Sequence, residues 1–73
     1  MELFTAVYEQ VGGWWIGYVE EIPGANAQER TLEEVRESLK EAVQLILEVN
    51  RDISRRSAEG RTVIREPLLS NAA

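Results

Sequence analysis

The side chains that could carry catalysis in this 73-residue chain are carboxylates and hydroxyls, because the sequence contains neither histidine nor cysteine. The common nucleophile–base pairs and the soft metal-ligand sets are therefore missing. None of the serines stands in a Gly-x-Ser-x-Gly setting, and Gly12-Gly13 precedes an apolar alternating run and not a helix, so no phosphate-binding loop is present. We expect no catalytic residue, no metal site and no cofactor, and we predict that the protein is not an enzyme.

Two carboxylate pairs remain to be explained. Glu33-Glu34 follows Thr31, and this spacing matches a capping box, in which Thr31 and Glu34 bond to each other's backbone amides at the start of a helix. Glu20-Glu21 is interpreted as the solvated end of a strand. Metal binding or acid–base chemistry at Glu20-Glu21 is the alternative.

Charge is unevenly distributed along the chain. The net charge is −5, with ten acidic against three basic residues in positions 1–50 and three acidic against five basic residues in positions 51–73. The acidic part argues against broad binding to nucleic-acid phosphates and favours a basic protein partner. The arginines at 51–65 complement the negative end of a helix dipole, and contact with nucleic acid is the alternative for them.

Trp14 and Trp15 give the strongest binding signal. Adjacent strand residues point to opposite faces of a sheet, so the two rings cannot share one core. Burying such a ring removes about 150–250 Å² of surface from water. A domain of this size, without disulfides, is marginally stable alone. We therefore expect one tryptophan to pack on the protein's own helix and the other to lie in an interface with another chain. The alternative is one tryptophan in the core and one half-exposed on the surface.

The elements that must position these residues follow from periodicity and turn chemistry. Residues 3–11 and 14–21 read as two strands joined by Gly12-Gly13, a register that sets Val11 opposite Trp14 and Val7 opposite Tyr18. Ile22-Pro23-Gly24 turns the chain, and residues 25–30 form a short third strand. An amphipathic helix follows from about Thr31 to Arg56. Residues 61–69 read as a last strand, which Pro67 either confines to a sheet edge or ends.

This order predicts one α+β domain over residues 1–73, with a three-stranded antiparallel sheet, one long helix and a C-terminal strand (β-β-β-α-β). A helix of about 25 residues spans about 37 Å, longer than a typical strand of about 17–20 Å. Its segment 42–49 is apolar nearly all round. We expect another chain to cover the apolar helix surface that the protein's own sheet does not cover. The residues predicted to form a partner or oligomer interface are Trp14, Trp15, Leu45, Leu47 and Ile53.

Three groups of residues together resemble the HicB-like antitoxin domain. They are Gly13-Trp14-Trp15, Ile22-Pro23-Gly24 and Thr31-Leu32-Glu33-Glu34, and the resemblance covers about residues 3–47. It implies a partial ribonuclease-H-like fold and a role in a type II toxin–antitoxin pair. The implied partner is a small basic RNA-cleaving toxin, which such a domain masks, and the domain itself often forms dimers or tetramers.

We do not infer operator binding from this resemblance. Only six residues follow Pro67, so we expect no C-terminal DNA-binding domain and no direct DNA binding. No apolar run is long enough to cross a membrane and no signal-peptide pattern is seen, so a cytoplasmic location without membrane contact is expected. Two alternatives stay open: an orphan homo-oligomer that binds a small ligand or RNA, and, least favoured, a metal-dependent nuclease.

Overall fold

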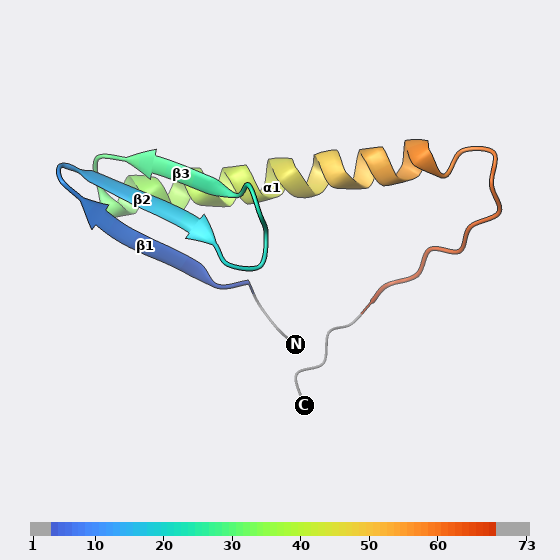
Figure 1. Cartoon of the computed structure of the whole chain (residues 1–73), viewed down its shortest axis with the longest axis horizontal. Helices are drawn as coiled ribbons and strands as arrows, with labels where there is room; N and C mark the ends of the chain where they lie inside the picture. Colours follow the sequence, from blue (N-terminus) through green and yellow to red (C-terminus); the bar gives the residue numbers. More distant parts are fainter. Residues whose placement is uncertain (1–3, 69–73) are drawn as a thin grey trace, which may run out of the picture.

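The computed structural model describes residues 4–68 of the chain. Three antiparallel strands form one sheet in the order β1-β2-β3, and one helix lies along a single face of that sheet (Figure 1). The elements are β1 (Ala6–Val11), β2 (Trp14–Val19), β3 (Asn26–Glu29) and α1 (Leu32–Ser57). The α+β class, the three-stranded sheet and the long helix predicted from the sequence are confirmed.

The β1–β2 hairpin has the predicted register. Val11 pairs with Trp14 and Val7 with Tyr18 across the antiparallel ladder. Gly12 has φ +59°, whereas Gly13 does not have a positive φ. A positive φ at the first central residue alone is typical of a type II′ turn, whose twist suits a tight hairpin. Local turn chemistry therefore determines which side chains share a face of the sheet.

A second tight turn separates β2 from β3. The Ala25 amide donates to the Ile22 carbonyl at 3.2 Å, with Pro23 and Gly24 between them and Gly24 at φ +88°. This is the geometry of a type II turn, which favours proline at its second and glycine at its third position. The turn brings β3 back along β2, where Gly17 pairs with Ala27.

The helix begins with Thr31 as its N-cap. The Glu34 amide donates to Thr31 Oγ1 at 3.1 Å, as predicted. The Glu34 carboxylate accepts from the Thr31 hydroxyl at 2.9 Å and not from the Thr31 amide, so this half of the capping box differs from the expectation. The helix ends at Ser57, one residue beyond the predicted end, and Arg55 and Arg56 lie in its last turn.

The core lies between α1 and the inner face of the sheet. Val35 and Leu39 from the helix and Val19 from β2 are buried, together with Ala25 after the turn. The helix packs against β2 and β3 and leaves β1 mostly uncovered. Ile46 packs against the core cluster, and the last turns of the helix extend beyond the sheet (Figure 1). We call this part of α1, residues 47–57, the overhang.

The predicted C-terminal strand is not seen. Residues 62–68 form no strand, and Leu69 lies outside the described residues. Their expected pairing fails for a geometric reason: the chain leaves the helix at the end of the overhang, where no edge of its own sheet lies beside it (Figure 1). Strand periodicity in a segment creates a strand only when a neighbouring strand accepts its backbone hydrogen bonds.

Candidate protein-binding surfaces

The outer sheet face, which points away from the helix, is apolar over most of its area. Alternation places five apolar residues of β1 and β2 on it. Two of them are half-buried, and the others are exposed: Val11 by 49%, Trp14 by 37% and Tyr18 by 42%. The apolar residues of this face are Val7, Val11, Trp14, Ile16 and Tyr18, and they share it with the polar residues Glu9, Asn26 and Gln28.

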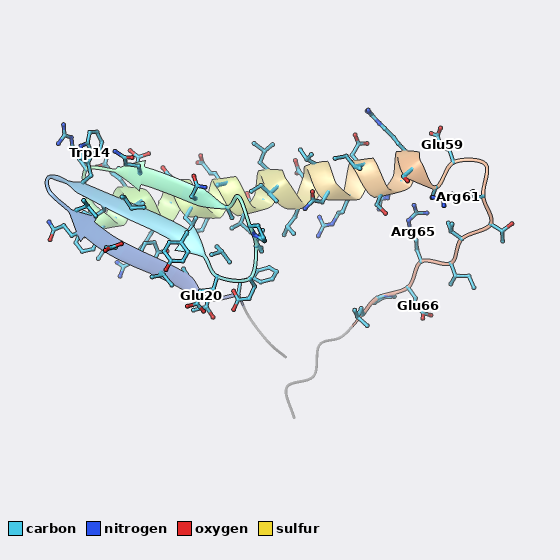
Figure 2. The ribbon with its side chains drawn as sticks, in the orientation of Figure 1. Trp14, Glu20, Glu59, Arg61, Arg65 and Glu66 are labelled. Atoms are coloured by element: carbon cyan, nitrogen blue, oxygen red, sulfur yellow. The ribbon has the colours of Figure 1, made fainter. Side chains whose placement is uncertain are left out.

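Trp14 is held in place on the outer sheet face by Arg30. The Arg30 guanidinium lies 3.8 Å from the centroid of the Trp14 ring, within cation–π distance. Arg30 Nη1 also donates to the Gly13 carbonyl at 3.4 Å. Figure 2 shows Trp14 at the hairpin end of the sheet. The stack makes Trp14 a fixed aromatic anchor, the type of residue that dominates protein interfaces.

Trp15 lies on the opposite face of the sheet from Trp14. It pairs with Glu29, whose carboxylate accepts from the Ser38 hydroxyl of α1 at 2.7 Å, so this face is the one turned toward the helix. Trp15 is half-buried there. The expected division of the two rings between two faces is confirmed, whereas their role in an interface stays a prediction.

The other three predicted interface residues lie on the helix, on more than one side of it. Ile53 follows Ile46 by seven residues, so it continues the core-facing stripe into the overhang, and it is 59% exposed. Leu45 lies on one flank of this stripe and is 61% exposed, whereas Leu47 is half-buried on the other flank. The structure therefore separates the five predicted residues over the outer sheet face, the inner face and the helix.

An apolar groove lies between the start of β1 and α1. It has a volume of about 310 Å³, and Phe4, Ala6, Val19, Leu39 and Val43 line it together with Lys40 and Gln44. Phe4 is 55% exposed. No feature of the sequence predicts this groove, because it joins β1 to residues of α1 that are more than thirty positions away in the chain.

The Glu21 carboxylate and the Glu20 backbone amide have a structural role. Glu21 Oε1 accepts from the Thr5 amide at 2.7 Å, and the Glu20 amide donates to the Thr5 carbonyl at 3.0 Å. The backbone hydrogen bond from Thr5 holds the pKa of Glu21 below its usual value. The two bonds fasten the start of β1 to the end of β2. Within residues 4–68, no three carboxylates come close enough together to hold a metal ion.

Arginines surround the end of the helix. Arg56 pairs with Asp52 at 3.1 Å, one turn away. A hollow of about 340 Å³ lies between the overhang and the C-terminal segment, and its lining includes Arg51, Arg55 and Arg65. None of these three forms an ion pair with another described residue. The hollow is open and positively charged, so it suits an anion better than an apolar ligand.

Comparison with known proteins finds similarity to UPF0150 proteins. The chain is 50% identical over 46 residues to UPF0150 protein ssl0738 of Synechocystis sp.. The matched stretch covers 60% of this chain and 62% of the relative. For a UPF0150 protein of Thermotoga maritima the identity is 39% over 49 residues, which cover 64% of this chain and 65% of the relative. The chain thus spans less than two thirds of the length of these two relatives.

A UPF0150 protein of Archaeoglobus fulgidus matches over a longer stretch. It is 30% identical over 53 residues, which cover 73% of this chain and 77% of the relative. No family model matches the chain, and no solved structure matches it. Among the described residues, no helix combines the length and the apolar character that crossing a membrane requires.

Proposed function

The chain belongs to the UPF0150 family, and from that premise we propose that it is a HicB-like, non-catalytic protein-binding module of the cytoplasm. Its function in this proposal is that of an antitoxin-like component of a type II toxin–antitoxin pair. It binds a small basic RNA-cleaving protein and masks the surface that this protein uses on RNA.

The outer sheet face is the observation that carries the proposal. It combines the fixed ring of Trp14 at the hairpin end with the exposed ring of Tyr18 on the same strand. Aromatic residues held in place on an apolar patch are typical of protein-binding sites. A sheet that packs one face on its own helix should alternate to a mainly polar outer face. Here Glu9, Asn26 and Gln28 are polar, but the other residues of β1 and β2 on this face are apolar.

Charge supports a basic partner. Glu9 lies on β1 among the apolar residues of the outer sheet face, and Glu20 follows β2. The first fifty residues carry ten acids against three bases. Complementary charge around an apolar patch accelerates association and rejects partners of the same sign. We propose further that the protein self-associates and that its C-terminal segment forms the fourth strand only in the assembled state.

Co-expression with a small basic protein encoded beside this gene tests the proposal. We expect the two proteins to purify together and the growth defect caused by the basic protein to disappear. Tyr18→Asp introduces a charge at the centre of the outer sheet face, so we expect at least a tenfold weaker complex. Asn50→Asp adds the same charge on the helix and is expected to bind like the wild type.

Two results contradict the proposal in different ways. If the wild-type chain neither binds the basic protein nor relieves its toxicity, the antitoxin function is wrong. If the complex forms but Tyr18→Asp binds as tightly as Asn50→Asp, the function stands and the outer sheet face is not the docking surface.

The arginine-lined hollow favours a second candidate, an orphan homo-oligomer that binds RNA or a small anionic ligand. Arg51, Arg55 and Arg65 converge on one cavity at the helix end. Guanidinium groups bind phosphate through paired hydrogen bonds. In this case a labelled single-stranded RNA should bind with a strong salt dependence, and Arg55→Gln should weaken it. RNA binding unaffected by this change would exclude the hollow as the site.

A further inference from the structure

The outer edge of β1 is an unpaired strand edge. In the sheet order β1-β2-β3, β1 pairs with β2 on one side only, and no described residue pairs with its other side. The strand contains neither proline nor lysine, and the helix does not cover it. Proteins usually protect such an edge with a charge, a proline or a covering element, because it is a template for another strand.

The apolar groove lies directly beside this edge. Ala6 of β1 and Phe4 just before it line one side, and Leu39 and Val43 of α1 line the other. A strand added to β1 would therefore cover the groove and place every second side chain in it. An exposed edge next to an open apolar groove is the arrangement used in recognition by strand addition.

The C-terminal segment, residues 61–68, has the properties of the missing strand. It belongs to no helix or strand, and Ile64 is exposed by 87% and Leu68 by 94%. These two residues are an even number apart, so they lie on the same side of an extended chain. Pro67 has no N–H to donate to a neighbouring strand. If the backbone groups of Ile64 and Leu68 face β1, the nitrogen of Pro67 faces away from β1, so this proline fits an edge strand.

We propose that the C-terminal segment of one copy adds to the free edge of β1 of a second copy, with Ile64 and Leu68 in the groove. Two copies related by a twofold axis make this exchange reciprocally. The partner is thus a second copy of this chain, and the strand predicted from the sequence forms between subunits.

Reach favours exchange between copies over folding back within one copy. Ser57 lies about 21 Å along the helix axis from Val43, which lines the groove. An extended chain needs about six residues to cover this distance. The turn at residues 58–60 uses the first three residues after the helix. Within one copy, about residues 61–66 would then be used to pass beneath the overhang, and only about Leu68 would arrive at the groove. In an antiparallel pair of helices, the overhang of one copy ends beside the sheet of the other.

Charge also matches the two surfaces. The C-terminal segment carries Arg61 and Arg65, and β1 presents Glu9. Glu66 lies on the side of Ile64 and Leu68, and Lys40, which also lines the groove, is its counter-charge there. Glu20 lies beside the start of β1, to which its amide is bonded, as Figure 2 shows. Opposite charges on neighbouring strands stabilise their pairing. The inference rests on the self-association in the proposed function and is independent of the toxin.

Cysteine cross-linking tests the exchange in the full chain, which has no cysteine of its own. One preparation carries Ala6→Cys and an added mass tag, and the other carries Ile64→Cys. After mixing and oxidation we expect a disulfide-linked heterodimer of the tagged and untagged chains. Glu41→Cys in place of Ala6→Cys is the control: residue 41 is exposed on the helix outside the groove, so no link to residue 64 is expected.

The double variant Ala6→Cys, Ile64→Cys separates the two geometries. Exchange between copies predicts oxidised species of dimer mass or larger. A link within one chain, which keeps the monomer mass, would overturn the proposal in favour of folding back. The absence of any link between positions 6 and 64 in both formats would overturn it as well.

Sedimentation equilibrium gives an independent readout. Ile64→Asp should raise the dissociation constant of the dimer at least tenfold, while Gln28→Asp, on β3, should not change it. Ile64 is exposed in the single chain, so helix content measured by circular dichroism should be unaffected. A dimer that resists Ile64→Asp overturns the exchange but not self-association, and a wild-type monomer overturns both. Neither result bears on toxin binding.

Discussion

Gly17 sets how closely the helix approaches the sheet. A β-carbon at this position would lie 3.0 Å from Tyr8 Cδ1 and 3.3 Å from Val35 Cγ2, both closer than ordinary van der Waals contact. Tyr8 already packs against the core cluster, and Val35 is fully buried. The space above Gly17 is therefore occupied by side chains from β1 and α1 that have little room to move.

We predict that Gly17→Ala destabilises the protein by about 1–3 kcal/mol, because either Tyr8 or the helix must shift. Urea unfolding followed by circular dichroism measures the change. Gly13→Ala is the control in the same hairpin, since its β-carbon would meet only the end of the Arg30 side chain. Equal unfolding midpoints for the two variants would contradict this account of Gly17.

Glu21 makes stability depend on pH. Its folded-state pKa is lowered, chiefly by the backbone hydrogen bond from Thr5. A lowered pKa adds stability above the unfolded-state pKa, and this stability is lost as the pH falls through the folded-state pKa. We predict that Glu21→Gln is less stable than the wild type at neutral pH and that the difference disappears in acid.

The titration of Glu21 can be followed directly by NMR of its carboxyl carbon. Its midpoint should lie below the ordinary glutamate value. Thr5→Val keeps the backbone N–H but removes the hydroxyl, so the pKa of Glu21 should stay lowered, though by less. A midpoint at the ordinary value in the wild type would show that the bond to Thr5 does not persist in solution.

At the scale of elements, α1 is stabilised differently along its length. Its first four turns pack on the sheet through Val35, Leu39 and Ile46, and its start is capped by Thr31. The overhang depends on its own backbone bonds and on pairs such as Arg56 with Asp52, which are exposed and add little. A helix end of this kind frays unless another chain packs on it.

The cap gives a prediction for this element. Thr31→Ala removes the acceptor of the Glu34 amide, so we expect a loss of about 1 kcal/mol in unfolding free energy. Thr31→Ser retains the hydroxyl and should lose little. Chemical denaturation of both variants measures the difference. If serine and alanine cost the same, the hydroxyl bond seen at 3.1 Å does not contribute to stability.

At the scale of the whole molecule, the apolar surface exceeds what one copy can bury. The outer sheet face, the groove and the overhang all expose large apolar side chains, whereas the buried core holds few residues. A domain of this size is marginally stable on its own. Association that buries these surfaces must therefore add to the stability of the fold.

We predict that the thermal unfolding midpoint rises with protein concentration, because mass action favours the folded, associated state. Scanning calorimetry over about a hundredfold concentration range measures this. Ile64→Asp should show a lower midpoint than the wild type at the same concentration, because its dimer is weaker while the single chain is intact. A wild-type midpoint independent of concentration would indicate that a single copy is the stable unit.

The local structure of this protein is readable from its sequence. The Gly12-Gly13 turn determines the hairpin register, and the turn at Pro23-Gly24 and the cap at Thr31 mark where the next elements begin. Each depends on contacts between residues close in the chain, and the opposite faces of Trp14 and Trp15 follow from alternation alone.

The exposed surfaces and the free strand edge were decided only by the tertiary structure. The groove beside β1, the stacking of Arg30 on Trp14 and the absence of a strand at residues 62–68 each join segments that are far apart in the chain. Periodicity indicates that a segment suits a strand, but not whether an edge lies within its reach. Here the helix is longer than the sheet, so it carries the last segment away from its own β1 and leaves that edge open.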